Sequence, residues 1–117
     1  LPIYNMIKIK LNKKQTVPVE LGPVTFEVDA TDSGLDRIKK VFLSAQKKIA
    51  EIDDNATFEQ VMVIIEPIMD EAFEAGVFRK VYDYTGSMAI TMGAFAQAID
   101  GVHTEMNKRS GLDKYIK

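Results

Sequence analysis

The sequence contains no cysteine and only one histidine, His103. Without cysteine the chain has no disulfide bond, thiolate zinc site, iron–sulfur cluster or cysteine nucleophile. A single histidine also excludes paired-histidine metal motifs and histidine relays. These absences fit a reducing compartment and remove the commonest catalytic and metal-binding chemistries.

Long apolar runs and an excess of one charge are lacking as well. No apolar run approaches the roughly 20 residues that a membrane-spanning helix requires, so we expect no membrane partner. The 15 basic and 17 acidic residues give a net charge of −2, whereas dedicated nucleic-acid binders are usually clearly basic. With 117 residues, 46% of them hydrophobic, the chain has the size and composition of one globular domain.

Three short segments near the N-terminus, Met6–Leu11, Thr16–Leu21 and Val24–Asp29, have strand character. The first alternates apolar residues with lysines, which is typical of a half-buried strand. We expect an antiparallel β-ribbon of two or three strands that must pack on something else. Pro18 lacks an amide hydrogen and predicts an edge strand. Such an edge permits pairing within the chain or with a neighbouring subunit, so a homo-oligomer stays open.

The remaining sequence has helical periodicity. Apolar residues recur at steps of three and four from Leu35 to Ile52, which predicts an amphipathic helix capped by Ser33 with Asp36. Thr57–Gln60 is a capping box that opens a second helix.

In that second helix, Pro67 predicts a kink and Gly76 a C-terminal cap. Val77–Tyr84 follows as a short helix or turn, and Ser87 caps the last helix. The last helix carries a heptad-like series of apolar residues, namely Met88, Met92, Phe95, Ile99, Val102 and Met106.

The predicted fold class is α+β, mostly α: a small N-terminal antiparallel β-ribbon followed by a bundle of three to four helices. Residues 6–110 form the single domain. We expect Leu1–Asn5 to be a non-native leader, from a vector or an upstream reading frame, and residues 111–117 to form a polar C-terminal tail.

Carboxylates offer the main candidates for chemistry. Glu66, Asp70 and Glu74 follow one another at four-residue steps on one helix face, where carboxylates could bind a divalent cation or act as acid and base. No calcium-loop spacing or histidine ligand accompanies them, so a solvated face, or a surface for a basic partner, is the simpler interpretation. The sequence has no phosphate-binding loop and no nucleophile elbow. We therefore predict no catalytic residue, metal or cofactor, and a protein that is not an enzyme.

Methionines and a surplus of apolar residues point to protein partners. Five of the six methionines lie on apolar helix stripes, and methionine suits surfaces that accept varied apolar partners. The second helix has five consecutive apolar residues from Val61, more than one face accommodates. We expect a peptide-binding groove or an oligomer surface, with some of the same residues in the core. The candidate partner-binding residues are Met62, Ile65, Met69, Phe73, Met88, Met92, Phe95 and Ile99.

The order of these features resembles a known family. An acidic, aromatic-flanked segment, Ile68–Tyr82, precedes a final helix that contains Ala94–Val102, behind a β-ribbon and a helical body. This arrangement is similar to the tail assembly chaperones of long-tailed siphophages and their prophages.

The resemblance implies a non-enzymatic viral protein of the host bacterial cytoplasm. Such chaperones bind the aggregation-prone tape measure protein, help tail tube protein assemble around it, and are absent from the mature virion. The first alternative is a structural virion component, such as a head–tail connector or tail completion protein. A small regulatory protein that binds nucleic acid through lysine-rich faces, or an enzyme, are further alternatives.

Overall fold

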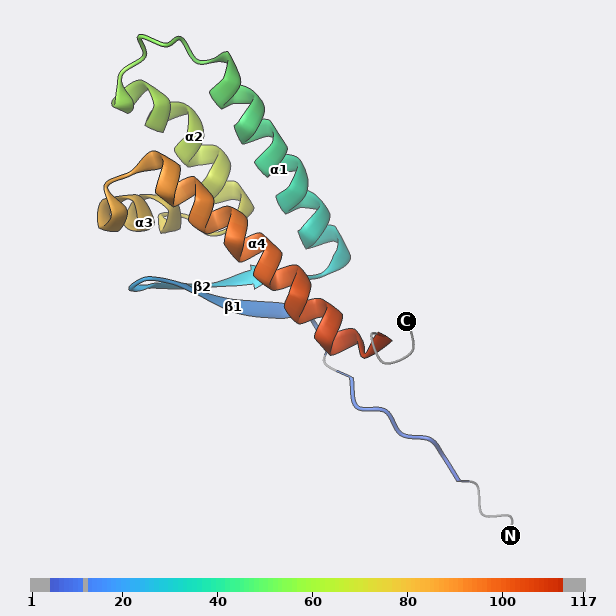
Figure 1. Ribbon diagram of the computed structural model, residues 1–117. Helices are drawn as coiled ribbons and strands as arrows, with labels where there is room; N and C mark the ends of the chain where they lie inside the picture. Colours follow the sequence, from blue (N-terminus) through green and yellow to red (C-terminus); the bar gives the residue numbers. More distant parts are fainter. Residues whose placement is uncertain (1–4, 12, 113–117) are drawn as a thin grey trace.

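The computed structural model describes residues 5–11 and 13–112 (Figure 1). Its elements are β1 (Thr16–Leu21), β2 (Val24–Asp29), α1 (Asp32–Glu51), α2 (Phe58–Ala72), α3 (Val77–Thr85) and α4 (Met88–Ser110). The predicted α+β class, with a β-ribbon followed by helices, is confirmed. Most of the expected leader and of the expected C-terminal tail lies outside the described residues.

The two strands form an antiparallel hairpin around Gly22, whose φ of 58° suits glycine in a tight turn. Val17, Val19 and Leu21 pair with Val28, Phe26 and Val24. These six side chains lie on the side of the hairpin that packs against the helices. Within the described residues β1 pairs with β2 alone, which confirms the edge position that Pro18 predicted.

The segment Met6–Leu11 is not a strand, contrary to the sequence-based expectation. Its chain is irregular and projects away from the body of the protein (Figure 1). Met6, Ile7, Ile9 and Leu11 are 75%, 86%, 75% and 84% exposed. An alternating pattern supplies two faces but no partner, and no described strand lies beside this segment. We call Met6–Leu11 the arm.

Helix α1 begins two residues earlier than predicted. Its N-cap is Thr31, not Ser33: the Thr31 Oγ1 accepts a hydrogen bond from the Gly34 amide at 3.1 Å. The same hydroxyl donates to the Asp29 Oδ1 at 2.6 Å. The end of β2 and the start of α1 are therefore joined through one carboxylate, which the sequence pattern did not show.

Helix α2 begins as predicted and ends earlier. Thr57 and Gln60 form a reciprocal capping box, with bonds of 2.8 and 3.3 Å. The helix continues through the exposed Pro67 and ends at Ala72. Gly76, with φ of 84°, is the N-cap of α3 and not the C-cap of α2. The helix stops because Phe73 turns into the core, where its ring lies 4.9 Å from that of Phe95.

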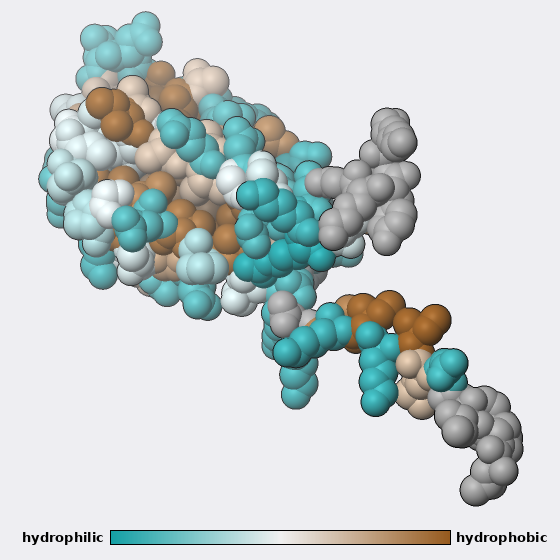
Figure 2. Space-filling view, turned by 60° about the horizontal axis from the view of Figure 1, so that its bottom comes forward, coloured by the Kyte–Doolittle hydropathy of each residue, from teal (hydrophilic) through white to brown (hydrophobic). Residues whose placement is uncertain are grey.

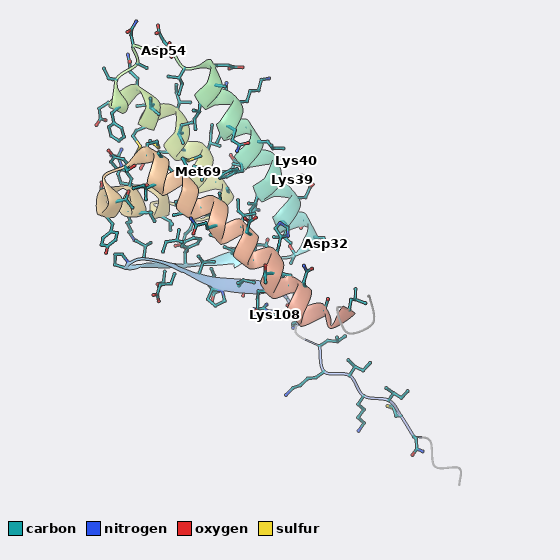
Figure 3. All side chains as sticks on the ribbon, viewed as in Figure 1. Asp32, Lys39, Lys40, Asp54, Met69 and Lys108 are labelled. Carbon is teal, nitrogen blue, oxygen red and sulfur yellow. The ribbon has the colours of Figure 1, made fainter. Side chains whose placement is uncertain are left out.

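Phenylalanine rings join the hairpin to the helices. Phe26 of β2 contacts Phe73 and Phe95 at centroid distances of 5.8 and 5.9 Å, and Phe78 of α3 stacks on Phe95 at 5.6 Å. Figure 3 shows Met69 between α2 and α4, whereas Lys39 and Lys40 stand on the outer side of α1. The loop that joins α1 to α2 projects from the body of the protein (Figure 1), and just beyond it Phe58 at the start of α2 stacks on Tyr82 of α3 at 4.6 Å.

Candidate partner-binding surfaces

The structure separates the eight predicted partner-binding residues into two groups. Met62, Ile65, Met69 and Phe95 are 0% exposed and belong to the core. A partner cannot reach these four side chains while the chain is folded, so their assignment to a binding surface is corrected. Their helical spacing fits a core as well as an interface, and burial decides between the two.

The other four, Phe73, Met88, Met92 and Ile99, are half-buried against the core. Phe73 and Ile99 line a groove of about 350 Å³ between α1 and α4, which Leu35, Ile38, Phe42 and Leu43 complete on the α1 side. Met88 and Met92 lie at the start of α4 and retain some exposed surface. For these four residues, partner binding stays a prediction.

The acidic face of α2 is partly used within the chain. Glu66 accepts two hydrogen bonds from Arg79 of α3, at 3.1 and 3.0 Å from Nε and Nη2. The bond to Glu66 raises the pKa of Arg79. Asp70 is half-buried, with its Oδ1 inaccessible and without a hydrogen-bond partner, and Glu74 is exposed. The three carboxylates therefore do not form one uniform surface for a basic partner.

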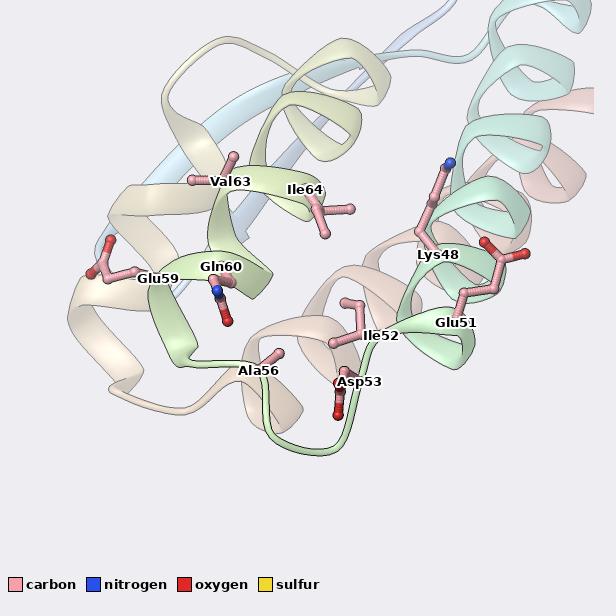
Figure 4. Close-up of a pocket in the computed structure, with 9 residues that line it drawn as sticks. All are labelled: Lys48, Glu51, Ile52, Asp53, Ala56, Glu59, Gln60, Val63 and Ile64. Carbon is pink, nitrogen blue, oxygen red and sulfur yellow. The ribbon is translucent and has the colours of Figure 1, made fainter.

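A wide groove lies between α1 and α2, near the loop that joins them. It has a volume of about 710 Å³, and its lining residues come from both helices and the loop (Figure 4). They are Lys48, Glu51, Ile52, Asp53, Ala56, Glu59, Gln60, Val63 and Ile64. Figure 4 shows Val63 and Ile64 on α2 across from Lys48 and Glu51 on α1, with Ile52 and Ala56 where the helices are joined.

Exposed aliphatic side chains of α2 line this groove. Val63 is 73% exposed and Ile64 38%. We call these two side chains, together with Ile52 just past the end of α1, the hairpin apolar surface. Large apolar side chains grouped on one face of a monomer often mark an interaction site.

Sequence reasoning missed these residues although a signal was present. The run Val61–Ile65 is too apolar for a single buried face. The structure turns Met62 and Ile65 inward and leaves Val63 and Ile64 outward. The run therefore contained both a core face and an exposed face, and the periodic residues were the buried ones.

The positions of the single histidine and of the acidic side chains bear on metal binding. His103 is exposed on α4, beside the groove between α1 and α4. In residues 5–11 and 13–112, no three acidic or histidine side chains gather as a metal site would require. None of the described helices is both long and apolar enough to cross a membrane.

No protein-family model, curated protein or solved structure matches this chain. What the chain does is therefore inferred from its own residues and surfaces.

Proposed function

We propose that the protein is a phage tail assembly chaperone that holds apolar helical stretches of the tape measure protein on the hairpin apolar surface. The observation that carries this proposal is the 73% exposure of Val63, with Ile64 beside it in the groove between α1 and α2. A groove between two antiparallel helices accepts the ridge of a third helix, which is a common form of peptide recognition. The family resemblance supplies the identity of the partner.

The charges around the groove suit a tolerant binder. Lys48 stands on the rim together with Glu51, Asp53 and Glu59, so both signs are present. Exposed charges of mixed sign contribute little affinity and select weakly among sequences. Affinity would come from aliphatic burial, which lets one surface hold many apolar helical stretches.

Capture of the tape measure protein tests this proposal. The tagged chain is expressed together with the tape measure protein of the same phage, and the captured amount is compared among variants. Val63→Asp and Ile64→Asp each place a charge in the groove and should reduce capture at least tenfold. Ile90→Asp is the matched control, because Ile90 is 63% exposed on α4, away from the groove.

The helical circular dichroism of all three variants should equal that of the unmodified chain, because the substituted side chains are exposed. Normal capture by both groove variants would refute the assignment of the groove. Failure of the unmodified chain to capture the tape measure protein would refute the chaperone function itself.

A structural virion component is the second candidate, and the projecting arm favours it. Subunits of assemblies often exchange terminal segments with their neighbours. Mass spectrometry of purified particles distinguishes the two functions: a chaperone is absent from the finished virion, whereas a connector or completion protein is present in stoichiometric amounts.

A further inference from the structure

The arm has the pattern of a half-buried strand without a surface to cover. Ile7, Ile9 and Leu11 occupy one side and Lys8 and Lys10 the other, and Figure 2 shows brown and teal residues along this segment, which stands clear of the body. Four apolar side chains of this six-residue segment are each at least 75% exposed. Contact of that much apolar surface with water is unfavourable in free energy. Such a segment is expected to be covered by another strand edge and an apolar surface.

The free edge of β1 offers both a strand edge and an apolar surface. The amide of Ala30 donates to the Gln15 carbonyl at 2.9 Å, which fixes the alternation of hydrogen bonds along the hairpin. The odd-numbered residues of β1 therefore bond to β2, and the backbone groups of Thr16, Pro18 and Glu20 point to the free edge. These groups open on a groove of about 540 Å³ between β1 and α4.

Small residues on α4 keep this groove open. Ala98 and Gly101 lie opposite Val17–Leu21, and a Cβ added at Gly101 would meet no atom within 4 Å. Glu20, Glu105 and Arg109 also line the groove, and Glu105 pairs with Arg109 at 2.9 Å. The groove therefore has room for aliphatic side chains, and Glu20 offers a carboxylate that complements lysine.

We propose that the arm of a second copy of this chain adds to the free edge of β1 as a third, antiparallel strand. Five arm residues, 7–11, fall opposite residues 21–17 of β1. The register places Lys8 opposite Glu20 on the outer face and Ile9 opposite Val19 on the inner face. In this register the apolar side of the arm extends the apolar side of the hairpin and covers Ala98 and Gly101.

The direction of the arm favours a second copy over the arm's own chain. The arm enters β1 from beyond the end of the sheet (Figure 1), so pairing with its own β1 requires a sharp reversal before Thr16. Two copies related by a twofold axis need no reversal. With Lys8 opposite Glu20 the axis passes near Lys14, and each arm covers the other copy's β1. The exchange is reciprocal, as a closed dimer requires.

Pro18 and Arg109 limit the new ladder without preventing it. Pro18 has no amide hydrogen to offer, but its carbonyl accepts from Lys10 in this register. The Thr16 carbonyl already accepts from the Arg109 Nη1 at 2.9 Å. Only Glu20 exchanges both backbone hydrogen bonds with the arm, at Lys8. Because the ladder is short, the stability of the dimer depends mainly on burial of Ile7, Ile9 and Leu11.

Sedimentation equilibrium of the full chain tests the proposal, with dimer expected. Lys8→Glu and Glu20→Lys, made separately, put like charges opposite each other twice per dimer and should each raise the dimer dissociation constant about tenfold. An equimolar mixture of the two variants should dimerise as tightly as the unmodified chain, because opposite charges meet in both pairs of the heterodimer. Rescue in the mixture cannot arise if each arm pairs with its own chain.

Substitutions in the groove give an independent control. Gly101→Leu fills the groove and should make the chain monomeric with unchanged helical circular dichroism. Gly93→Leu, where an added Cβ likewise meets no atom within 4 Å, lies outside the groove and should leave the dimer intact. A monomeric unmodified chain at high micromolar concentration overturns the proposal, as does a dimer that neither Gly101→Leu nor the charge variants weaken.

Discussion

Met6–Leu11 and β2 have similar alternating patterns, and the folded chain places them in opposite environments. Apolar and polar residues alternate over residues 7–11 of the arm and over all six positions of β2. In β2, Val24, Phe26 and Val28 are 9%, 5% and 2% exposed, whereas every apolar residue of the arm is at least 75% exposed. Alternation therefore identifies a strand and its two faces, but it does not say which surface the strand will cover.

Local connections account for the difference. β2 is joined to β1 by a two-residue turn and to α1 by the bonds from Thr31 to Asp29. These links hold β2 where its apolar side meets the helices. The arm has no such link within the described residues, and its partner must be reached from outside.

The largest effect should come from Phe26 of β2, compared with Ile9 of the arm. Phe26→Ala removes a ring that contacts Phe73 and Phe95, and it should lower the free energy of unfolding by about 3–5 kcal/mol. Ile9→Ala removes an exposed side chain and should leave the unfolding of the monomer unchanged. Urea denaturation of both variants at low protein concentration measures this contrast.

A strong destabilisation by Ile9→Ala under those conditions would mean that the arm is buried within its own chain. The comparison between the arm and β2 would then collapse, because both segments would be parts of one core.

The second effect concerns the link between β2 and α1. Gly34 is buried, and an added Cβ would lie 2.5 Å from both the carbonyl oxygen and the Cγ of Asp29. Gly34→Ala should therefore cost about 1–3 kcal/mol of stability, because the backbone must shift. Gly93→Ala is the control: its Cβ meets open space, and the better helix propensity of alanine should add up to about 1 kcal/mol. Equal melting temperatures of the two variants would contradict the close contact.

Much of the fold could be predicted because its determinants are local. The capping box at Thr57, the turn at Gly22 and the helical periodicities each depend on residues a few positions apart. Errors arose where distant contacts decide. Helix α2 stops before Gly76 because Phe73 is held by Phe26 and Phe95, and no local pattern contains that information.

The candidate surface was predicted in kind but not in position. Apolar surplus on the second helix predicts a partner-binding face, and the structure leaves an exposed apolar face on that helix. Met62 and Ile65 belong to the clearest periodic stripe of the sequence, and that stripe is the one that the core buries. An exposed apolar residue like Val63 can be recognised only once the buried stripe is known.

A third, smaller effect is expected at the start of α2. Thr57→Ala removes the side chain that accepts from the Gln60 amide, and loss of an N-cap typically costs about 1 kcal/mol. Thr104→Ala is the control, since its hydroxyl bonds the Asp100 carbonyl within α4 and caps nothing. Thermal unfolding should rank Thr57→Ala below Thr104→Ala, and the reverse order would show that the capping box does not hold the α1–α2 connection.

The smallest effect is a pH dependence at the link that β2 has and the arm lacks. The hydrogen bonds from the Thr31 side chain and amide lower the pKa of Asp29 below its ordinary value of 3.8. A lowered pKa in the folded state stabilises the protein above pH 4, and this contribution is lost as the pH falls through 4 toward the folded pKa. Asp29→Asn should therefore be less stable than the unmodified chain at pH 6, and the difference should be smaller at pH 3.

Thr31→Val removes the hydrogen bond from the Thr31 side chain and should move the pKa of the Asp29 carboxyl back toward its ordinary value in an NMR titration. An unchanged Asp29 titration in Thr31→Val would show that the carboxylate does not depend on the helix cap, and the explanation for the fixed position of β2 would lose one of its two links.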